Sequence, residues 1–470
     1  MNKLFLTLDD LFELPTAAVY KPEKFQPVDS ISIDSRQISG DSLFVAVKGE
    51  KFDGHDFILE AVKKKASAVI INEKYLSRFN ELPVPVITVK DTTTALGDLA
   101  KIWRCKLNAK VIGITGSSGK TTTKEMLAAV LCEKFKVNKT IGNNNNHIGV
   151  PLTIFSTNLT HEILVLELGT NHFGEIAYTA NIAQPDYALT TNIGNSHLEF
   201  LRNKKGVLEE KIELFNTTAA KGGTVFINND DSYLSKTMFN HPKRVTFGFE
   251  NTADIKGVIK EINNEGKPVV EVQYKGKSFE FVLPAYGEQN ARNFLAAAAI
   301  ALRLGLDNKE IAAGISKFKP IEKRLNVKKI KKSILIDDTY NANPESMRYA
   351  IDLMTEFKNY KRRIAVLGDM FELGEQSPKL HADLSKVIKR NKIDFAILTG
   401  DMMVNLESEL IKNGTESVLI KDRDKLKNFL TRFDFSNSVV LVKGSRGMKM
   451  EEFAKVISEL IAKREDKVYG

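Results

Sequence analysis

Cysteine and proline are both scarce in this chain. Among its 470 residues the only cysteines are Cys105 and Cys132, and neither has a partner at the spacing of a metal-binding or redox-active pair. We therefore predict two buried thiols in a reducing compartment. The 13 prolines and the lack of any low-complexity tract argue against long disordered segments.

Long apolar runs are also missing. The longest, FLAAAAIAL at 294–302, is far shorter than the roughly 20 residues that span a bilayer. The chain starts with MNKLFLTLDDLFELP, in which Asp9 and Asp10 interrupt the apolar stretch that a secretory signal requires. We expect no membrane insertion and a cytoplasmic location.

The charge excess is modest, because 68 Lys and Arg against 59 Asp and Glu give a formal net charge of +9. The basic residues are scattered, many of them on predicted helical faces such as 63–65. Solvated helix faces explain this distribution better than a nucleic-acid patch does, so we expect no nucleic-acid partner. A positive field nevertheless suits a polyanionic small substrate.

Strand and helix patterns divide the chain into three α/β blocks. Residues 1–90 carry short strand patterns and one helix near 56–66. Residues 91–318 alternate strands with helices, which predicts a doubly wound parallel sheet, and 253–284 changes to an antiparallel patch. Residues 319–470 alternate again and predict a second, smaller Rossmann-like domain.

A glycine-rich turn joins an apolar strand to a helix in residues 111–126, VIGITGSSGKTTTKEM. In such a loop, backbone N–H groups and the positive end of the helix face phosphate oxygens. We expect Lys120 to reach the β- and γ-phosphates and Thr121 to offer its hydroxyl to Mg²⁺. The strict pattern has a glycine where this chain has Ile114, so the loop is of a shorter type. The predicted nucleoside triphosphate cradle is Gly116, Ser117, Ser118, Gly119, Lys120, Thr121 and Thr122.

Four other features are candidates for chemistry. Glu167 ends a predicted strand, where a carboxylate is well placed to hold Mg²⁺, although a helix cap would use the same residue. His197 follows the next strand, and a single histidine is more often structural than a ligand. Lys211 lies on a helical stretch with lysines that look solvated, so the residues alone assign it no role. Asn143 and Asn144 belong to the loop GNNNNHIG, which suits substrate binding about as well as a plain turn.

Eight motifs resemble, in the family's order, those of the Mur ligases, the ATP-dependent amide-forming enzymes of peptidoglycan precursor synthesis. Each motif is weak alone, but eight in order are specific and cover essentially the whole chain. The resemblance implies a uridine-nucleotide domain, a central ATPase domain and a C-terminal domain, in agreement with the three blocks. The motifs are DSRQISGDSLFVAVKGEKFDGHDF, GITGSSGKTTTKEM, GNNNNHIGVPLT, ELGTNHFGEI, NIGNSHLEF, YGEQNARNFLAAAA, DDTYNANPESM and LGDMFELGE.

The resemblance also implies roles for individual residues. Lys211 matches a lysine that family members carry as a carbamate, which ligates a second Mg²⁺ with His197 and Glu167 as companion ligands. Two positions depart from the family pattern: Gln289 stands where many relatives have His, and His147 where relatives often have an acidic residue. The remaining matches are Asn290, Asn293, Arg324 and Asp338 for ATP, Ser35 and Arg36 for the uridine nucleotide, and Tyr340 and Asn341 beside the C-terminal contacts.

The implied reaction joins D-alanyl-D-alanine to UDP-N-acetylmuramoyl-tripeptide through an acyl phosphate, with release of ADP. The turn DTYNANPESM favours this subgroup, because the enzyme that adds the third peptide residue has a DNPR-type motif there. We expect a monomer. Three alternatives stay open: another Mur or folylpolyglutamate-type ligase, a P-loop nucleotide switch that makes no amide, and a non-catalytic homologue that serves as a binding subunit.

Overall fold

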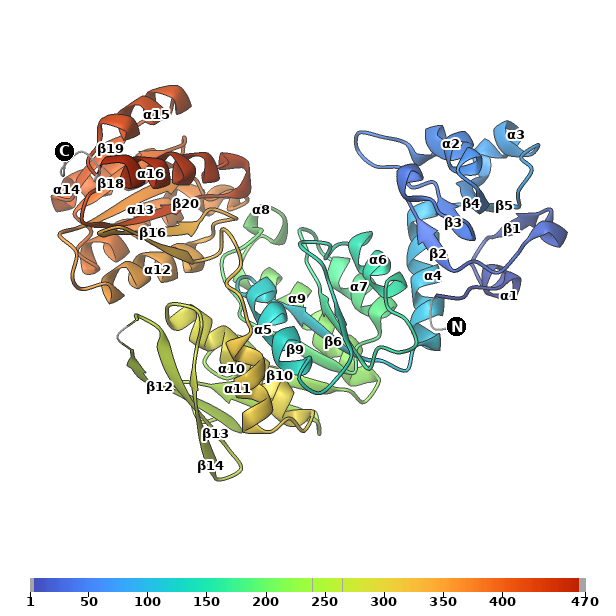
Figure 1. Ribbon diagram of the computed structural model, residues 1–470, viewed down its shortest axis with the longest axis horizontal. Coiled ribbons are helices and arrows are strands. Elements are labelled where there is room, and N and C mark those ends of the chain that lie inside the picture. The colour runs from blue at the N-terminus through green and yellow to red at the C-terminus, as the bar shows by residue number, and fades with distance from the viewer. Residues whose placement is uncertain (1–3, 239, 264, 465–470) are drawn as a thin grey trace.

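Three α/β sheets, each built from a consecutive stretch of the chain, make up the structure (Figure 1). The structure is a computed structural model and describes residues 4–238, 240–263 and 265–464. The predicted α/β fold class is therefore confirmed.

The first sheet has five strands in the order β1-β5-β4-β3-β2, parallel except for β1. The predicted helix near 56–66 is shorter than expected, because a 3₁₀ turn at Gly54–Phe57 precedes it. The strands are β1 Ala18–Tyr20, β2 Ser30–Ser32, β3 Ser42–Val45, β4 Ala66–Asn72 and β5 Val86–Val89, and the helices are α1 Leu8–Phe12, α2 Ile58–Lys63 and α3 Leu76–Phe79.

The central sheet has nine strands in the order β14-β13-β12-β11-β10-β9-β6-β8-β7. The predicted antiparallel patch extends this sheet, because β12 pairs in parallel with β11 and antiparallel with β13. The strands are β6 Lys110–Thr115, β7 Val137–Lys139, β8 Ile163–Glu167, β9 Tyr187–Thr190, β10 Thr224–Asn228, β11 Arg244–Gly248, β12 Ile255–Ile262, β13 Pro268–Tyr274 and β14 Lys277–Val282. The helices are α4 Thr92–Lys106, α5 Lys120–Leu131, α6 Gly149–Phe155, α7 Glu175–Ala183, α8 Leu198–Leu201, α9 Lys204–Ala220, α10 Glu288–Arg303 and α11 Asn308–Ser316.

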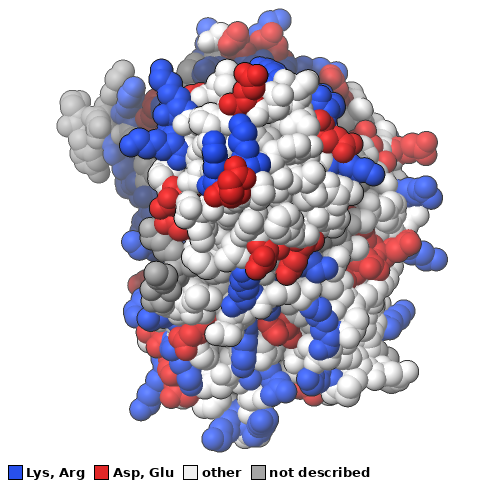
Figure 2. All heavy atoms as spheres, turned by 90° about the vertical axis from the view of Figure 1, so that its right-hand side faces the viewer, with Lys and Arg blue, Asp and Glu red and all other residues white. Residues whose placement is uncertain are grey.

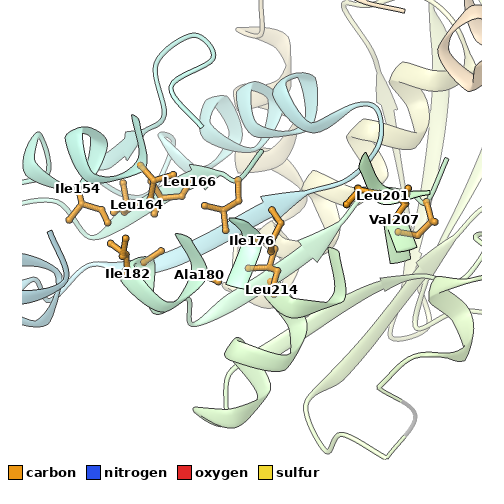
Figure 3. Packing of buried hydrophobic residues seen from close by; sticks show 14 of the residues in the cluster. Ile154, Leu164, Leu166, Ile176, Ala180, Ile182, Leu201, Val207 and Leu214 are labelled. Carbon is orange, nitrogen blue, oxygen red and sulfur yellow. The ribbon is translucent and has the colours of Figure 1, made fainter. Parts of the chain in front are cut away.

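Buried strands with an apolar side chain on both faces hold the central layers together. Along β8, Leu164 and Leu166 face one core and Val165 faces the other, as the alternation of side chains in a strand requires. Figure 3 shows the first core, where Ile176 of α7 and Leu214 of α9 lie with these leucines. Helices α5, α10 and α11 cover the opposite face.

The order of the central strands places a ligand crevice after β6. Strand β6 pairs with β8 on one side and with β9 on the other. In open parallel sheets, ligands bind at the carboxyl ends of the strands where the order reverses in this way. The glycine-rich turn that follows β6 therefore lies at the crevice.

The C-terminal sheet has six strands in the order β15-β16-β20-β17-β18-β19, parallel except for the edge strand β15. The strands are β15 Asn326–Ile330, β16 Ser333–Asp338, β17 Arg362–Gly368, β18 Phe395–Thr399, β19 Glu416–Leu419 and β20 Ser438–Lys443. The helices are α12 Pro344–Leu353, α13 Ser377–Arg390, α14 Met403–Asn413, α15 Arg423–Arg432 and α16 Glu451–Arg464.

The prediction that both cysteines are buried is wrong. Both cysteines are exposed rather than buried. Cys105 lies two residues after the buried Trp103, on the opposite side of α4, and Cys132 follows the last turn of α5.

Figure 2 shows one face of the molecule, on which basic and acidic side chains are interspersed. Within the described residues, no helix combines the length and apolarity needed to cross a membrane.

Two carboxylates meet where the C-terminal domain packs on the central domain. Glu356 follows α12 in the 3₁₀ turn Met354–Glu356, and Glu288 begins α10. Burial, together with the negative charges of Glu288 and Asp352, raises the pKa of Glu356 to about 7, although a backbone hydrogen bond opposes this shift. The folded protein therefore binds a proton at Glu356 more tightly than the unfolded chain does.

We predict that Glu356 makes stability depend on pH in a window set by this shift. Its contribution is complete below the ordinary pKa of 4.5 and is lost as the pH rises through about 7. Glu356→Gln should remove the loss, because the amide stays neutral. Thermal unfolding at about pH 5.5 and about pH 8.5 measures the difference. The exposed Glu459→Gln serves as control, and an equal pH-dependent fall in wild type and Glu356→Gln would contradict the assignment.

Candidate active site

A cavity of about 300 Å³ lies between the central and C-terminal domains, at the crevice after β6. The central domain contributes the turn 117–122, the asparagine loop, the segment 167–171 and the start of α10. The C-terminal domain contributes Arg324 and the turn 338–346. Residues from two domains thus enclose one polar cavity.

The glycine turn before α5 has no room for side chains. Gly116 and Gly119 adopt positive φ angles of 145° and 81°. A Cβ atom at Gly116 would lie 1.9 Å from Thr191 Oγ1, and one at Gly119 would lie 2.3 Å from Asn293 Oδ1. Since α5 begins at Lys120, its N-terminal N–H groups face the cavity. These features fit a phosphate group held by backbone donors.

Two lysines influence each other electrostatically at this site, Lys120 lining the cavity and Lys211 buried on α9. Lys120 Nζ donates to the carbonyl oxygen of Gly116 at 2.7 Å. Burial lowers the pKa of Lys120; the Glu167 carboxylate opposes this shift and Arg324 adds to it. Lys211 on α9 is 1% exposed, and burial, reinforced by the charge of Lys120, lowers its pKa well below the usual range. Burial therefore favours the neutral amine of Lys211 over its ammonium form.

Glu167, at the end of β8, uses only one of its two carboxylate oxygens for a hydrogen bond within the described residues. Its Oε1 accepts a hydrogen bond from Asn145 Nδ2 at 2.8 Å. Its Oε2 is buried without a hydrogen-bond partner in the described part of the chain, and Lys124 Nζ lies 3.7 Å away. A buried carboxylate oxygen with unused acceptor capacity fits a hard cation such as Mg²⁺.

His197 joins the site from the segment before α8. Its Nδ1 lies 2.5 Å from Glu372 Oε2 of the C-terminal domain. Burial lowers its pKa; Glu372 opposes this shift, and Lys211 and Lys120 add to it. The hydrogen bond from His197 is the largest cause of the lowered pKa of Glu372. A neutral imidazole is the form that binds metals.

The donor set for a metal is incomplete as the chain stands. Across residues 4–464, leaving out 239 and 264, no three His, Cys, Asp or Glu side chains converge into a metal site. Mg²⁺ commonly completes its coordination with water and substrate phosphate oxygens. Glu167, His197 and the hydroxyl of Thr121 are donors of the kinds that can join such water and phosphate ligands around magnesium.

Two arginines of the C-terminal domain lie against the ring of Tyr340, which lines the cavity. The guanidinium groups of Arg324 and Arg446 lie 3.8 Å and 5.0 Å from the ring centre of Tyr340. Lys443 is 1% exposed and donates to Asp338 Oδ2 at 2.5 Å and to the carbonyl of Asn341 at 2.9 Å. Asp338 thus neutralises Lys443, while the stacked arginines keep their positive charge near the cavity.

A second cavity of about 110 Å³ adjoins the first, sharing Gln289, Asn293 and Tyr349 with it. Asn290 Nδ2 donates to the carbonyl of Tyr286 at 2.8 Å, and Gln289 Nε2 donates to Asn293 Oδ1 at 3.1 Å. Amides and aromatic rings suit a purine base, so the two cavities together have the polarity expected for a nucleotide.

The structure brings most of the predicted residues together, with a few exceptions. Asn143 lines the cavity, whereas its next lining neighbour is Asn145 rather than Asn144. Ser35 and Arg36 lie in the N-terminal domain, where Ser35 donates to Glu60 and the exposed Arg36 pairs with Asp34. Among the lining residues that sequence reasoning did not assign are Thr170, Asn171, Asn343, Ser346 and Tyr349. Thr170 and Asn171 lie within the motif ELGTNHFGEI, and Asn343 and Ser346 lie within DDTYNANPESM, so the motifs marked these segments without singling out the residues. Tyr349 lies on α12, outside the quoted motifs.

Three family models match the chain in order. "Mur ligase family, catalytic domain" matches residues 27–104, "Mur ligase middle domain" 114–301, and "Mur ligase, glutamate ligase domain" 323–446. A curated relative, the UDP-N-acetylmuramoyl-tripeptide--D-alanyl-D-alanine ligase of Bacillus subtilis strain 168, is 34% identical over 469 residues, which cover 96% of this chain and 98% of that protein. The chain belongs to the Mur ligase family.

Other relatives match this Mur ligase over nearly its whole length. The ligase of the same name from Escherichia coli K12 is 33% identical over 441 residues, covering 92% of this chain and 94% of that protein. MurF from Acinetobacter baumannii superposes with a TM-score of 0.87 at 30% identity, covering 98% and 100% of the two chains. MurF ligase from Thermotoga maritima, crystallised with ADP, gives 0.81 at 30% identity, covering 93% and 98%. The predicted family and the three-domain fold are confirmed.

We predict that Gly119→Ala weakens ATP binding to this Mur ligase at least about tenfold while the fold is kept. Left-handed backbone costs an alanine roughly 1–2 kcal/mol, and the new Cβ would meet Asn293 Oδ1 at 2.3 Å. Titration calorimetry with ATP measures the affinity. Gly40→Ala is the control, because nothing lies within 4 Å of a Cβ there. Unchanged ATP affinity would argue against backbone contact at this turn.

Proposed function

We propose that this Mur ligase joins D-alanyl-D-alanine to UDP-N-acetylmuramoyl-tripeptide, with conversion of ATP to ADP and phosphate. One observation carries the proposal: a phosphate cradle with Lys120 inside it opens into a cavity that the C-terminal domain closes. Relatives of this name match at 33–36% identity over at least 90% of the chain. An amide ligase needs both a nucleotide cradle and room for a second substrate.

The chemistry explains why ATP is required. A carboxylate is a poor acyl donor, because its leaving group would be an oxide. In the proposed first step a carboxylate oxygen of the tripeptide attacks the γ-phosphorus of ATP, the bond to the β,γ-bridging oxygen breaks, and ADP leaves. In the second step the amine of D-alanyl-D-alanine attacks the acyl carbon. The C–O bond to phosphate then breaks, and the amine loses a proton.

Positive charge from this chain makes the first step possible, since it brings two anions together. We assign Lys120 to the β- and γ-phosphates, where its charge offsets the repulsion and the charge that spreads over the transferred oxygens. Arg324 of the C-terminal domain adds a second charge when the domains are closed. Closure also excludes water, which would hydrolyse the acyl phosphate.

We propose that the oxygen and nitrogen donors near the cavity serve two magnesium sites. We assign Thr121 and Glu167 to the first, and Glu167, His197 and carbamylated Lys211 to the second. When bound, magnesium neutralises phosphate charge. The neutral amine of Lys211 attacks CO₂ and releases a proton, which gives an anionic oxygen ligand in place of a repelling ammonium group.

The remaining roles follow the domain plan. We assign the uridine nucleotide to residues 1–90 with Ser35 and Arg36, ATP to residues 91–318 with Asn290 and Asn293, and the dipeptide side and ATP closure to residues 319–470. Asn143 and Asn144 are proposed for the peptide substrate, and Tyr340, Asn341 and Asp338 for the C-terminal contacts. We propose the cytoplasm as the location, because the reaction consumes ATP.

Phosphate release tests the function directly. We expect wild type to release phosphate and form the amide, identified by mass, only when ATP, UDP-N-acetylmuramoyl-tripeptide and D-alanyl-D-alanine are all present. Lys120→Ala should fall by about 10²–10³-fold, as when one charge-assisted transition-state contact is removed. Equal phosphate release without the two small substrates would favour a nucleotide switch instead.

Lys211→Ala should lose most activity and regain part of it with added short carboxylic acids, which fill the vacated ligand position. Wild type incubated with ¹³C-bicarbonate should show a carbamate signal by NMR that Lys211→Ala lacks. Lys205→Ala, exposed on the same helix, is the matched control and should behave as wild type. Full activity of Lys211→Ala would refute the carbamate.

A further inference from the structure

Two carboxylates of the C-terminal domain hold one short segment of the central domain, residues 194–204. Glu345, at the start of α12, accepts hydrogen bonds from Asn195 N at 2.9 Å and from Asn195 Nδ2 at 3.1 Å, and pairs with Lys204 Nζ at 3.1 Å. Glu372 lies on the turn between β17 and α13 and contacts His197 Nδ1 at 2.5 Å. The segment that carries His197 is therefore fixed from the other domain.

The contact at His197 involves both side chains and backbone. The carbonyl oxygen of Glu372 accepts a hydrogen bond from Glu199 N at 3.1 Å. His197 and Glu372 both adopt left-handed backbone, with φ angles of 54° and 61°. Non-glycine residues rarely adopt this conformation unless the surroundings impose it. The two turns therefore meet in a defined geometry rather than by chance proximity of flexible side chains.

The pairing decides which nitrogen of His197 is available. Because Nδ1 is bonded to the Glu372 carboxylate, Nε2 is the nitrogen left for a cation. Carboxylates commonly bond the second nitrogen of a metal-binding histidine, where they fix the orientation and tautomer of the ring. In this chain the carboxylate comes from the opposite domain, so the orientation of the ring depends on a contact between the two domains.

We propose that Glu372 is a positioning residue that orients His197 across the domain interface, so that domain closure completes the magnesium site. The inference rests on the proposed function, because it takes His197 as a magnesium ligand. Domain closure would then do two things at once: it would bring Arg324 to the nucleotide and orient His197 for the cation.

The test measures cation affinity in the full chain. Mn²⁺, as a paramagnetic probe for Mg²⁺, is titrated by EPR into the protein with a non-hydrolysable ATP analogue and UDP-N-acetylmuramoyl-tripeptide. Glu372→Ala should weaken Mn²⁺ binding by about 10–100-fold, the usual effect of removing such a partner. Glu372→Gln should fall between, because its amide oxygen still accepts from Nδ1–H. Glu375→Ala, exposed on the same turn, is the matched control and should bind as wild type.

A double-mutant cycle separates positioning from general damage. If Glu372 acts through His197, then Glu372→Ala added to His197→Ala should cause no further loss of Mn²⁺ affinity. Losses that add in full, or wild-type affinity in Glu372→Ala, would overturn the proposal. Amide formation by the wild type separates failure of the proposed function from failure of this inference. If the wild type makes no amide, the proposed function fails. If the wild type is active and Glu372→Ala binds Mn²⁺ normally, only this inference is overturned.

Discussion

Two lysines beside one cavity, the partly buried Lys120 and the buried Lys211, set the electrostatic constraint on which the candidate site depends. Burial lowers the pKa of both Lys120 and Lys211, and the positive charge of Lys120 adds to the shift at Lys211. Such a site is unfavourable until anions arrive. Nucleotide phosphates would satisfy Lys120, and CO₂ would convert Lys211 from a potential cation into an anion. The Glu167 oxygen that accepts no hydrogen bond from the described residues then suits the magnesium that these anions attract.

The fold meets this constraint by placing the phosphate turn and the opposite wall of the cavity on two separate domains. The phosphate turn follows a central strand, and the side chains of neighbouring strands pack on both faces of the sheet. The C-terminal domain carries Arg324, the Tyr340 turn and Glu372. It meets the central domain through contacts such as the one between Glu372 and His197. A rigid cradle and a separate closing wall suit a reaction whose intermediate must be protected from water.

Features encoded in short stretches were predictable, and features set by packing between distant segments were not. The cradle was predicted from the sequence because strand, turn and helix are adjacent, and Glu167 because a strand end fixes its position. Lys211 had no local signal; only the resemblance assigned it a role, and only the packing of α9 shows that it is buried. Glu372 meets His197 from 175 residues away. The cysteine prediction was wrong because exposure depends on which helix face a residue occupies.

The central claim is that the peptide carboxylate is activated by transfer of phosphate to its oxygen. The most direct test supplies the tripeptide substrate with ¹⁸O in its reacting carboxylate and analyses the released phosphate by mass spectrometry. The account predicts one ¹⁸O atom in each phosphate, because the oxygen that bonds to phosphorus leaves with it when the amine attacks. Phosphate without ¹⁸O, formed at the rate of amide synthesis, would contradict the account.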